Sequence, residues 1–523
     1  MKKYILIIAV FFTIGISGCK KDYLSLEVNP NAPSVATPGL LLSGALVTAA
    51  SNVEGPNYAE YGVWVGWFSP SGNFVPVSPL QQFQITNQSF TAPWTFLYQN
   101  LTNFNNLQIS AAADPSQANF QAIAMIMKAY DFEQLVDQFG DVPYTQAFHP
   151  STILFPAYDN QQAIYNDLVK QLDGAISLIN GHTTAANPGK ADVVFGGNMT
   201  GWKKFANTLK LRMAIRQSNL ATNAAKDDLA ATAGEGYLDE TMDAEVNPGY
   251  SNSLGFGVSQ QNPFWANYGD DTNGNPTGAN VFVRGGTFYI NTLNNFNDPR
   301  VNMINFTTSG SGGTAVGGNV LGDTKTTKAN PLTSAIGPGL LISPSQNAYL
   351  MSSAEALFLT SEALIDGYSI TAGTSKTAQS AYEAGITASF VAMKAGSVTT
   401  FDPASTTWST VYASAATSTA LAAAYYGQSI QNVGWAASAN KQEAIIYQKW
   451  IALTGHASLE AYMEYQRTKF PVLPDPISID PGAVSTFPPI RQYYPLSELT
   501  SNGPNLAKEG TINIFTTKIF WEK

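Results

Sequence analysis

Cysteine is almost absent from this chain of 523 residues, which contains a single one, Cys19. An intramolecular disulfide is therefore excluded, and a chain of this length must be stabilised by burial of its core. Histidine is also scarce. The three histidines, His149, His182 and His456, match no metal-ligand spacing. We therefore predict no metal site and no cofactor.

Charged residues are also scarce. Charged residues make up 12% of the chain, the net charge is −10 and the pI is near 4.9. Proteins that bind nucleic acid need basic patches to neutralise phosphates, so this class of function is excluded. The sequence also lacks a Gly-x-Ser-x-Gly turn and a phosphate-binding glycine motif before a helix, which argues against an enzyme.

Long apolar runs are absent after the N-terminus, where one short run has the pattern of a secretory signal. Two lysines precede the run over residues 4–16, and Ser17 and Gly18 stand directly before Cys19. A charged start, an apolar stretch and small residues before a cleavage site define such a signal. As a helix, the run covers roughly 20 Å, which is less than the ~30 Å of a hydrocarbon core.

The position of Cys19 predicts a lipid anchor. Small residues directly before a cysteine are typical of a bacterial lipoprotein signal, whose cysteine is acylated and becomes the mature N-terminus. We predict a signal peptide over residues 1–18, lipidation of Cys19 and a lipidated tether over residues 19–38. The alternative is that Cys19 merely lies near an ordinary cleavage site.

Helical periodicity dominates the rest of the chain, and it predicts a mainly α fold. The helices recur as pairs with short links, which is typical of tetratricopeptide-like scaffolds. Residues 234–344 are instead rich in Gly, Asn, Ser and Thr, and we predict loops or short strands there. We expect a single domain over residues 39–523, with this insert as a loop-rich, irregular binding flank. The predicted helices cover residues 39–52, 94–113, 116–139, 160–179, 200–220, 353–366, 375–395, 440–453 and 457–467.

Aromatic residues, by contrast, are plentiful, at 12% of the chain. Two clusters lie in loop-like sequence, and each contains a pair of rings three positions apart. Aromatic rings stack on the C–H faces of sugars, while amides bind the hydroxyls. Core packing is the alternative role of these rings. The candidate ligand-binding residues are Trp64, Trp67, Phe68, Phe74, Trp265 and Tyr268.

Two further motifs have a functional and a structural interpretation. Residues 270–275 resemble the start of a calcium loop, but Pro276 stands where the glycine belongs, so we predict a polar turn. Glu355 and Glu362 have the residue type of the carboxylate pair in a glycoside hydrolase. Because their helix is rich in Ala and Leu, we predict that they pair with arginines, and that the arginines of residues 200–220 form packing ion pairs.

The order of several short motifs along the chain resembles the SusD/RagB family of nutrient-binding outer-membrane lipoproteins, in its SusD-like branch. No single motif is diagnostic, and it is their order over most of the chain that carries the resemblance. The motifs are Cys19 with the small residues before it, and residues 29–33, 94–100, 137–144, 158–165, 201–212, 298–300, 354–363, 448–450, 466–468 and 491–495.

The resemblance implies a role at the cell surface without catalytic residues. It implies an α-rich fold with tetratricopeptide-like pairs, and a partnership as the lid of a SusC-like TonB-dependent outer-membrane transporter. The expected ligand is an oligosaccharide, and the lipid anchor is expected in the outer membrane, facing the cell exterior. The alternatives are a peptide-binding member of the same family, a lipid-anchored glycoside hydrolase, and a structural subunit whose own ligand site is vestigial.

Overall fold

The structure is a computed structural model. The signal peptide, Cys19 and most of the tether lie outside the described residues. No helix within the described ranges is long and apolar enough to cross a membrane. Those ranges are residues 37–74, 79–149, 151–307, 317–324, 329–402 and 407–522.

The mainly α fold is confirmed, and the long helices lie within a few residues of their predicted positions. Thr37, for example, caps the first of them, since its side chain accepts a hydrogen bond from the backbone N–H of Leu40 at 3.3 Å. The helices that correspond to the predicted ones are α2 (Pro38–Glu54), α4 (Thr91–Ala112), α5 (Ala118–Phe139), α6 (Gln161–Gly181), α7 (Met199–Arg216), α13 (Ser353–Ile365), α14 (Ala378–Ala392), α16 (Lys441–Ala452) and α17 (Ser458–Thr468).

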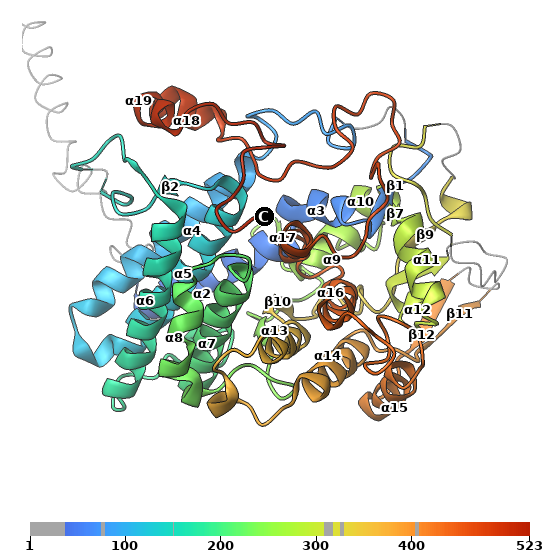
Figure 1. Cartoon of the computed structure of the whole chain (residues 1–523), viewed down its shortest axis with the longest axis horizontal. Helices are drawn as coiled ribbons and strands as arrows, with labels where there is room; N and C mark the ends of the chain where they lie inside the picture. Colours follow the sequence, from blue (N-terminus) through green and yellow to red (C-terminus); the bar gives the residue numbers. More distant parts are fainter. Residues whose placement is uncertain are drawn as a thin grey trace, which may run out of the picture.

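These helices pack as neighbours along the chain. The helices α4, α5, α6 and α7 stand side by side on the left of Figure 1, and α13, α14 and α16 form a second group below the centre. Helix α13 also contacts α7, so the two groups share one core. This arrangement is the tetratricopeptide-like scaffold expected from the paired helices.

The structure adds helices that the periodicity did not predict. Two of them are rich in alanine and have few large apolar residues to mark a face, and four lie inside the insert, where we had expected loops or strands. Their starts carry local signals, such as Asn262, which caps a helix with Pro263 in its first turn. The added helices are α3 (Ala59–Trp64), α8 (Ala224–Thr232), α9 (Pro263–Tyr268), α10 (Gly278–Phe282), α11 (Thr287–Asn295), α12 (Val301–Ile304), α15 (Ala415–Tyr426), α18 (Leu496–Ser501) and α19 (Gly503–Leu506).

The strands among the described residues form short antiparallel pairs rather than a large sheet. Several of them lie in the insert, on the right of Figure 1, where the chain is least helical. The pairs are β1 (Phe68–Pro70) with β7 (Val283–Gly285), β2 (Val142–Pro143) with β3 (Tyr158–Asp159), β4 (Ala244–Val246) with β10 (Ala348–Met351), β5 (Leu254–Gly255) with β6 (Val258–Ser259), β8 (Asn305–Thr307) with β9 (Ser334–Ile336), and β11 (Val398–Asp402) with β12 (Thr407–Val411).

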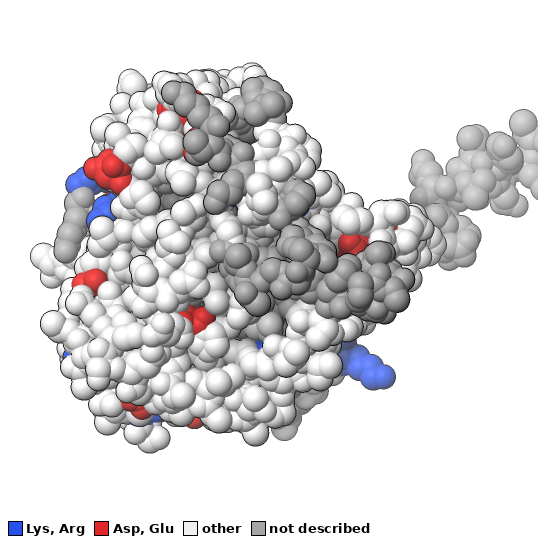
Figure 2. Space-filling view, turned by 90° about the vertical axis from the view of Figure 1, so that its right-hand side faces the viewer, with Lys and Arg blue, Asp and Glu red and all other residues white. Residues whose placement is uncertain are grey.

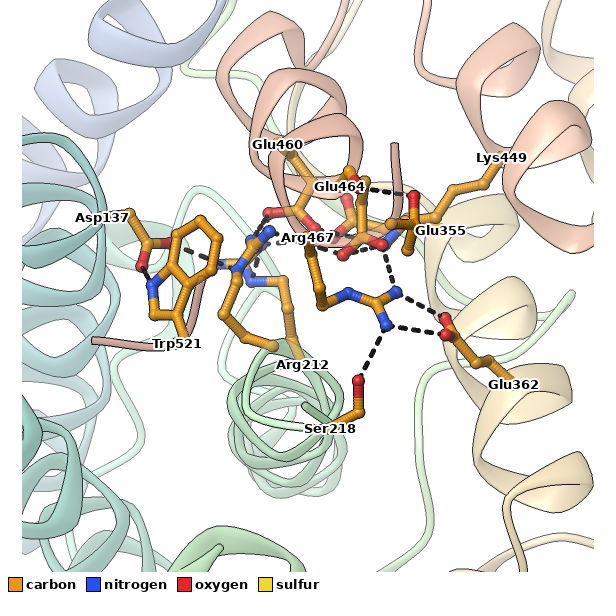
Figure 3. Close-up of polar contacts among 12 residues, drawn as sticks. Asp137, Arg212, Ser218, Glu355, Glu362, Lys449, Glu460, Glu464, Arg467 and Trp521 are labelled. Atoms are coloured by element: carbon orange, nitrogen blue, oxygen red, sulfur yellow. Dashed lines mark hydrogen bonds and ion pairs between the residues drawn. The ribbon is translucent and has the colours of Figure 1, made fainter. Parts of the chain in front are cut away.

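A buried network of charges joins the helices at the centre of the molecule (Figure 3). Glu460 on α17 lies at its middle, paired with Arg216 of α7 and, at 3.1 Å, with Lys449 of α16. Arg216 also reaches Asp137 of α5 at 3.4 Å. The indole N–H of Trp521 donates to the same Asp137 at 2.9 Å, so the C-terminal tail packs into this network.

The network also accounts for the two glutamates of α13. Glu355 pairs with Arg212 at 3.2 Å, and Glu362 pairs with Arg467 at 2.8 Å. Both carboxylates are buried. The predicted ion pairs of the arginines are confirmed, and neither glutamate is available to a substrate in this arrangement.

Because removing one partner of a buried ion pair leaves the other charge unpaired, Glu460→Gln is expected to destabilise the protein by about 3–5 kcal/mol. The free energy of unfolding from urea denaturation measures this loss. Glu240→Gln is the matched control. Glu240 pairs with Lys376 at the surface, where its side chain is 49% exposed, and its loss is expected to cost less than about 1 kcal/mol. Equal losses in the two variants would contradict the central role of Glu460.

The same carboxylate predicts sensitivity to acid. Burial alone would raise the pKa of Glu460, but Arg216, Lys449 and Arg212 together hold it below its ordinary value. A lowered folded-state pKa contributes stability that is complete above the unfolded pKa, about 4.3, and is lost as the pH falls further. The urea midpoint of the wild type is therefore expected to decrease as the pH is lowered below about 4. This decrease is expected to be steeper than that of Glu460→Gln. Parallel profiles would show that other groups set the acid limit.

Candidate functional site

A groove with a volume of about 340 Å³ opens on the loop-rich side of the molecule. Four segments form its walls: the stretch from α3 into β1, the start of α11, residues 319–321, and residues 473–479 of the proline-rich tail. We call it the loop groove. None of its lining residues is Asp, Glu, Lys or Arg.

Backbone pairing builds the floor of the loop groove. Strand β1 pairs with β7, so that Phe68 lies opposite Gly285. On the other side of β7, the backbone N–H of Asn319 donates to the carbonyl of Gly285 at 3.1 Å, and its side-chain amide donates to Pro70 at 2.9 Å. A β-carbon at Gly286 would lie 2.2 Å from the carbonyl oxygen of Gly66, so only glycine permits this close approach.

Aromatic and amide side chains line the loop groove. Phe68 contributes one wall, and Phe288 of α11, which is half-buried, contributes another. Phe288 packs against the ring of Trp450 with centroids 5.8 Å apart, and this contact holds its orientation. Asn291, one turn further along α11, is exposed and lines the same groove. The groove therefore combines ring faces with amide hydrogen-bonding groups.

The structure places the tryptophans of the first predicted cluster in the core. Trp64 and Trp67 have no exposed surface. Trp64 meets Tyr61 edge to face at 5.4 Å, while Trp67 lies against Phe68, with centroids 6.3 Å apart. Trp64 ends the short helix α3 and Trp67 lies in the turn between α3 and β1, and both side chains face inward although the flanking sequence is typical of a loop. In this conformation the two indoles support the groove and offer a ligand no free face.

The remaining predicted rings are not among the residues that line the loop groove. Tyr268 is buried, with its centroid 6.4 Å from that of Phe68. Phe74 is 43% exposed and meets Phe282 edge to face at 5.4 Å. Trp265 is half-buried, and its indole N–H donates to the carbonyl of Asp270 at 3.2 Å. Of the six residues, Phe68 alone is a lining residue, with Trp67 and Tyr268 in ring contact with it.

Sequence reasoning missed Phe288, Asn291 and Asn319. The signal that points to Phe288 is the glycine pair before it, Gly285 and Gly286, since adjacent glycines in a strand mark a close approach of backbone. The wall from residues 473–479 has no comparable signal. These residues reach the groove because the C-terminal tail runs across the molecule.

The calcium-like residues form a polar turn, as predicted. Asp271 accepts hydrogen bonds from the backbone N–H groups of Asn273 and Asn275, at 2.8 and 2.9 Å. Its carboxylate is thereby used to close the turn. Within the described part of the chain, no group of three or more His, Cys, Asp or Glu residues is arranged to hold a metal ion.

The surface around this side of the molecule carries little charge. Figure 2 shows the face that lies on the right of Figure 1, and acidic and basic side chains are few and scattered among uncharged ones. In the described part of this face, neither acidic nor basic side chains gather into a large patch. This is the surface expected for a neutral ligand.

Solved structures share this fold over almost their whole length. A SusD homologue from Bacteroides uniformis is 25% identical, with a TM-score of 0.69, and the match covers 92% of this chain and 99% of that one. A chitin-binding protein is 24% identical, with a TM-score of 0.70 and the same coverage. A chitin-binding SusD homologue from Flavobacterium johnsoniae is 23% identical, with a TM-score of 0.68, covering 92% and 98%. The comparison with curated proteins found no match.

The model of one sequence family matches the same part of the chain. Its model, described as starch-binding and associating with the outer membrane, matches residues 30–495. Its members are binding proteins and not enzymes. Since the match covers most of the chain and the solved SusD homologues share its fold, this protein belongs to the SusD-like family.

Proposed function

We propose that the protein is a cell-surface lipoprotein that captures an oligosaccharide in the loop groove and delivers it to a SusC-like TonB-dependent outer-membrane transporter. The observation that carries this proposal is the lining of the groove, which contains rings, aliphatic side chains and amides but no charged residue. Such a lining suits a neutral, hydroxyl-rich ligand and disfavours a charged one, whose desolvation it does not compensate.

The mechanism follows from the two kinds of lining group. The half-buried ring of Phe288 covers the apolar face of a sugar unit, while the exposed amide of Asn291 exchanges hydrogen bonds with hydroxyls. An aromatic contact contributes roughly 1 kcal/mol beyond the buried area. A few such contacts give weak, reversible binding, which a protein that passes its ligand to a transporter requires.

The predicted site residues divide into two roles in this proposal. Phe68 forms the buried back of the groove, and Trp67 and Tyr268 hold its ring in place. Phe74 and Trp265 contact the parts of a longer ligand that extend beyond the groove. Trp64 supports the wall from the core.

The titles of the solved chitin-binding structures suggest candidate ligands, as does the starch-binding description of the family. We therefore propose starch and chitin oligosaccharides as the first panel. Both are chains of uncharged sugar rings, in agreement with the uncharged groove.

Phe288→Ala is expected to weaken oligosaccharide binding about five- to tenfold, because it removes one ring contact. Isothermal titration with the panel measures the dissociation constants. Phe96→Ala is the control. Phe96 is 41% exposed on α4, outside the groove, and its loss is expected to leave binding unchanged. Ile479 lines the groove, so the NMR signal of its methyl groups shows in both variants whether a ligand occupies the groove.

Three outcomes would contradict the proposal. Binding of peptides but not of any oligosaccharide would favour the peptide-binding alternative. New reducing ends after incubation with an oligosaccharide would show a hydrolase. Co-purification with a transporter, but no ligand affinity at all, would favour a structural subunit.

The lipid anchor has its own test. Several acyl chains on Cys19 would hold the protein stably at the membrane, since each buried methylene adds about 0.8 kcal/mol. Cys19→Ala is therefore expected to move the protein from the membrane fraction to the soluble fraction of the cell envelope. Ser25→Ala, in the same tether, is the control and is expected to stay in the membrane fraction. A Cys19→Ala protein that has lost its signal peptide and still remains membrane-bound in cells without the transporter would refute the anchor.

A further inference from the structure

A second and larger pocket lies far from the loop groove. It has a volume of about 580 Å³ and is enclosed by α4, by the loop between β2 and β3, and by α18. These elements meet at the upper left of Figure 1, whereas β1 and β7 lie at the right. We call it the α4 pocket. Nothing in the oligosaccharide proposal uses it.

One face of α4 supplies an aromatic wall. Trp94, Tyr98, Thr102 and Asn106 follow one another at intervals of four residues, so they share a face of the helix, and all four line the pocket. The rings of Trp94 and Tyr98 contact each other, with centroids 4.9 Å apart. The hydroxyl of Tyr98 donates to the carbonyl of Pro143 at 2.7 Å, which fixes its ring. Phe148 adds a third ring from the loop.

A single carboxylate, that of Glu498 on α18, provides the formal charge of this wall. One of its oxygens accepts hydrogen bonds from the hydroxyl of Tyr158 at 2.6 Å and from the amide of Asn502 at 3.3 Å. No described residue forms an ion pair with Glu498, and none donates to its second oxygen. The residues that line the pocket include no Lys or Arg. The negative charge is therefore positioned but not neutralised.

The neighbouring phenols stay neutral beside this charge. Burial, followed by the nearby Glu498, raises the pKa of Tyr98, and burial with the hydrogen bond to Glu498 raises the pKa of Tyr158. His149 is the other titratable lining residue, and it is exposed at the edge. Lys128 lies in an adjoining polar cavity that shares Phe148 and His149 with the α4 pocket. Its ammonium lies 5.7 Å from the centre of the Phe148 ring and donates to Asn105 and Gln108, so it is not paired with Glu498.

Aromatic rings around an unpaired carboxylate match one class of ligand group. An organic ammonium is attracted by the ring faces and by the carboxylate together, and the attraction is stronger where water is excluded. We propose that the α4 pocket is a second binding site, which takes an amine-bearing sugar unit such as glucosamine. The lining of the pocket itself supports an amine as the ligand group. That a sugar carries this amine rests on the proposed function.

Glu498→Gln tests the site, because it keeps the shape and the accepting oxygen but removes the charge. The probes are a glucosamine oligosaccharide and its fully N-acetylated counterpart, which lacks the charge. Isothermal titration is expected to show about tenfold weaker binding of the amine-bearing probe to Glu498→Gln, and unchanged binding of the acetylated probe. Added salt is expected to weaken the binding of the amine-bearing probe and to leave the binding of the acetylated probe unchanged.

Isoleucine methyl signals in NMR separate the two sites. Ile153 lines the α4 pocket and Ile479 lines the loop groove, while Ile109 is exposed on α4 outside both. The amine-bearing probe is expected to shift Ile153 and to leave Ile109 unchanged. Phe288→Ala is expected to weaken the response of Ile479 without changing that of Ile153. Absence of ligand binding in the loop groove can therefore be observed separately from absence of ligand binding in the α4 pocket.

Two results would overturn the proposal. Equal affinity of the amine-bearing probe for the wild type and for Glu498→Gln, in proteins of equal thermal stability, would remove the carboxylate from the site. A lysine dipeptide that shifts Ile153, when the glucosamine oligosaccharide does not, would refute a sugar as the carrier of the amine. Glu240→Gln, a surface change elsewhere, is the control for loss of charge and is expected to bind like the wild type.

Discussion

The buried ion pairs around Glu460 are the constraint on which the rest of the structure depends. They connect α5, α7, α16 and α17, and through Glu355 and Glu362 they include α13. Charges removed from water are stable only with near-complete pairing, so these helices tolerate one relative arrangement. The apolar contacts between them permit sliding, whereas the charge pairs do not. The scaffold is thereby held rigid without any disulfide.

A rigid scaffold explains why the binding surfaces need so little regular structure of their own. The loop groove is formed by two short strands, the start of a helix and two irregular segments, yet each is tied to the core. Trp450 illustrates the link, because its ring packs against Phe288 and its indole N–H donates to Val65 at 3.0 Å. The α4 pocket is similarly built on a long helix. In the proposed function, the ligand contacts lie in side chains at the edges of this helical frame.

The sequence predicted the scaffold well and the lining of the proposed groove only at Phe68, and the reason is physical. Apolar residues on α5 or α17 repeat with the helical period, and the N-cap Thr37 marks a helix start directly. Trp64 and Trp67 lie beside glycine, serine and proline, a composition typical of a loop, but they face the core from the end of a short helix and from the turn that follows it. The groove residues Phe288 and Ile479 meet through the path of the chain, and local patterns do not encode that path.

The crossing of the C-terminal tail has a consequence for how the groove comes into being. Its walls combine residues near position 66 with residues near position 479, so one of the longest loop closures in the molecule must be complete before the site exists. A chain that ends before residue 473 has no fourth wall. The proposed groove is therefore a property of the finished polypeptide. Changes at residues 473–479 alter the groove directly, whereas the end of the tail, through Trp521, also belongs to the buried charge network.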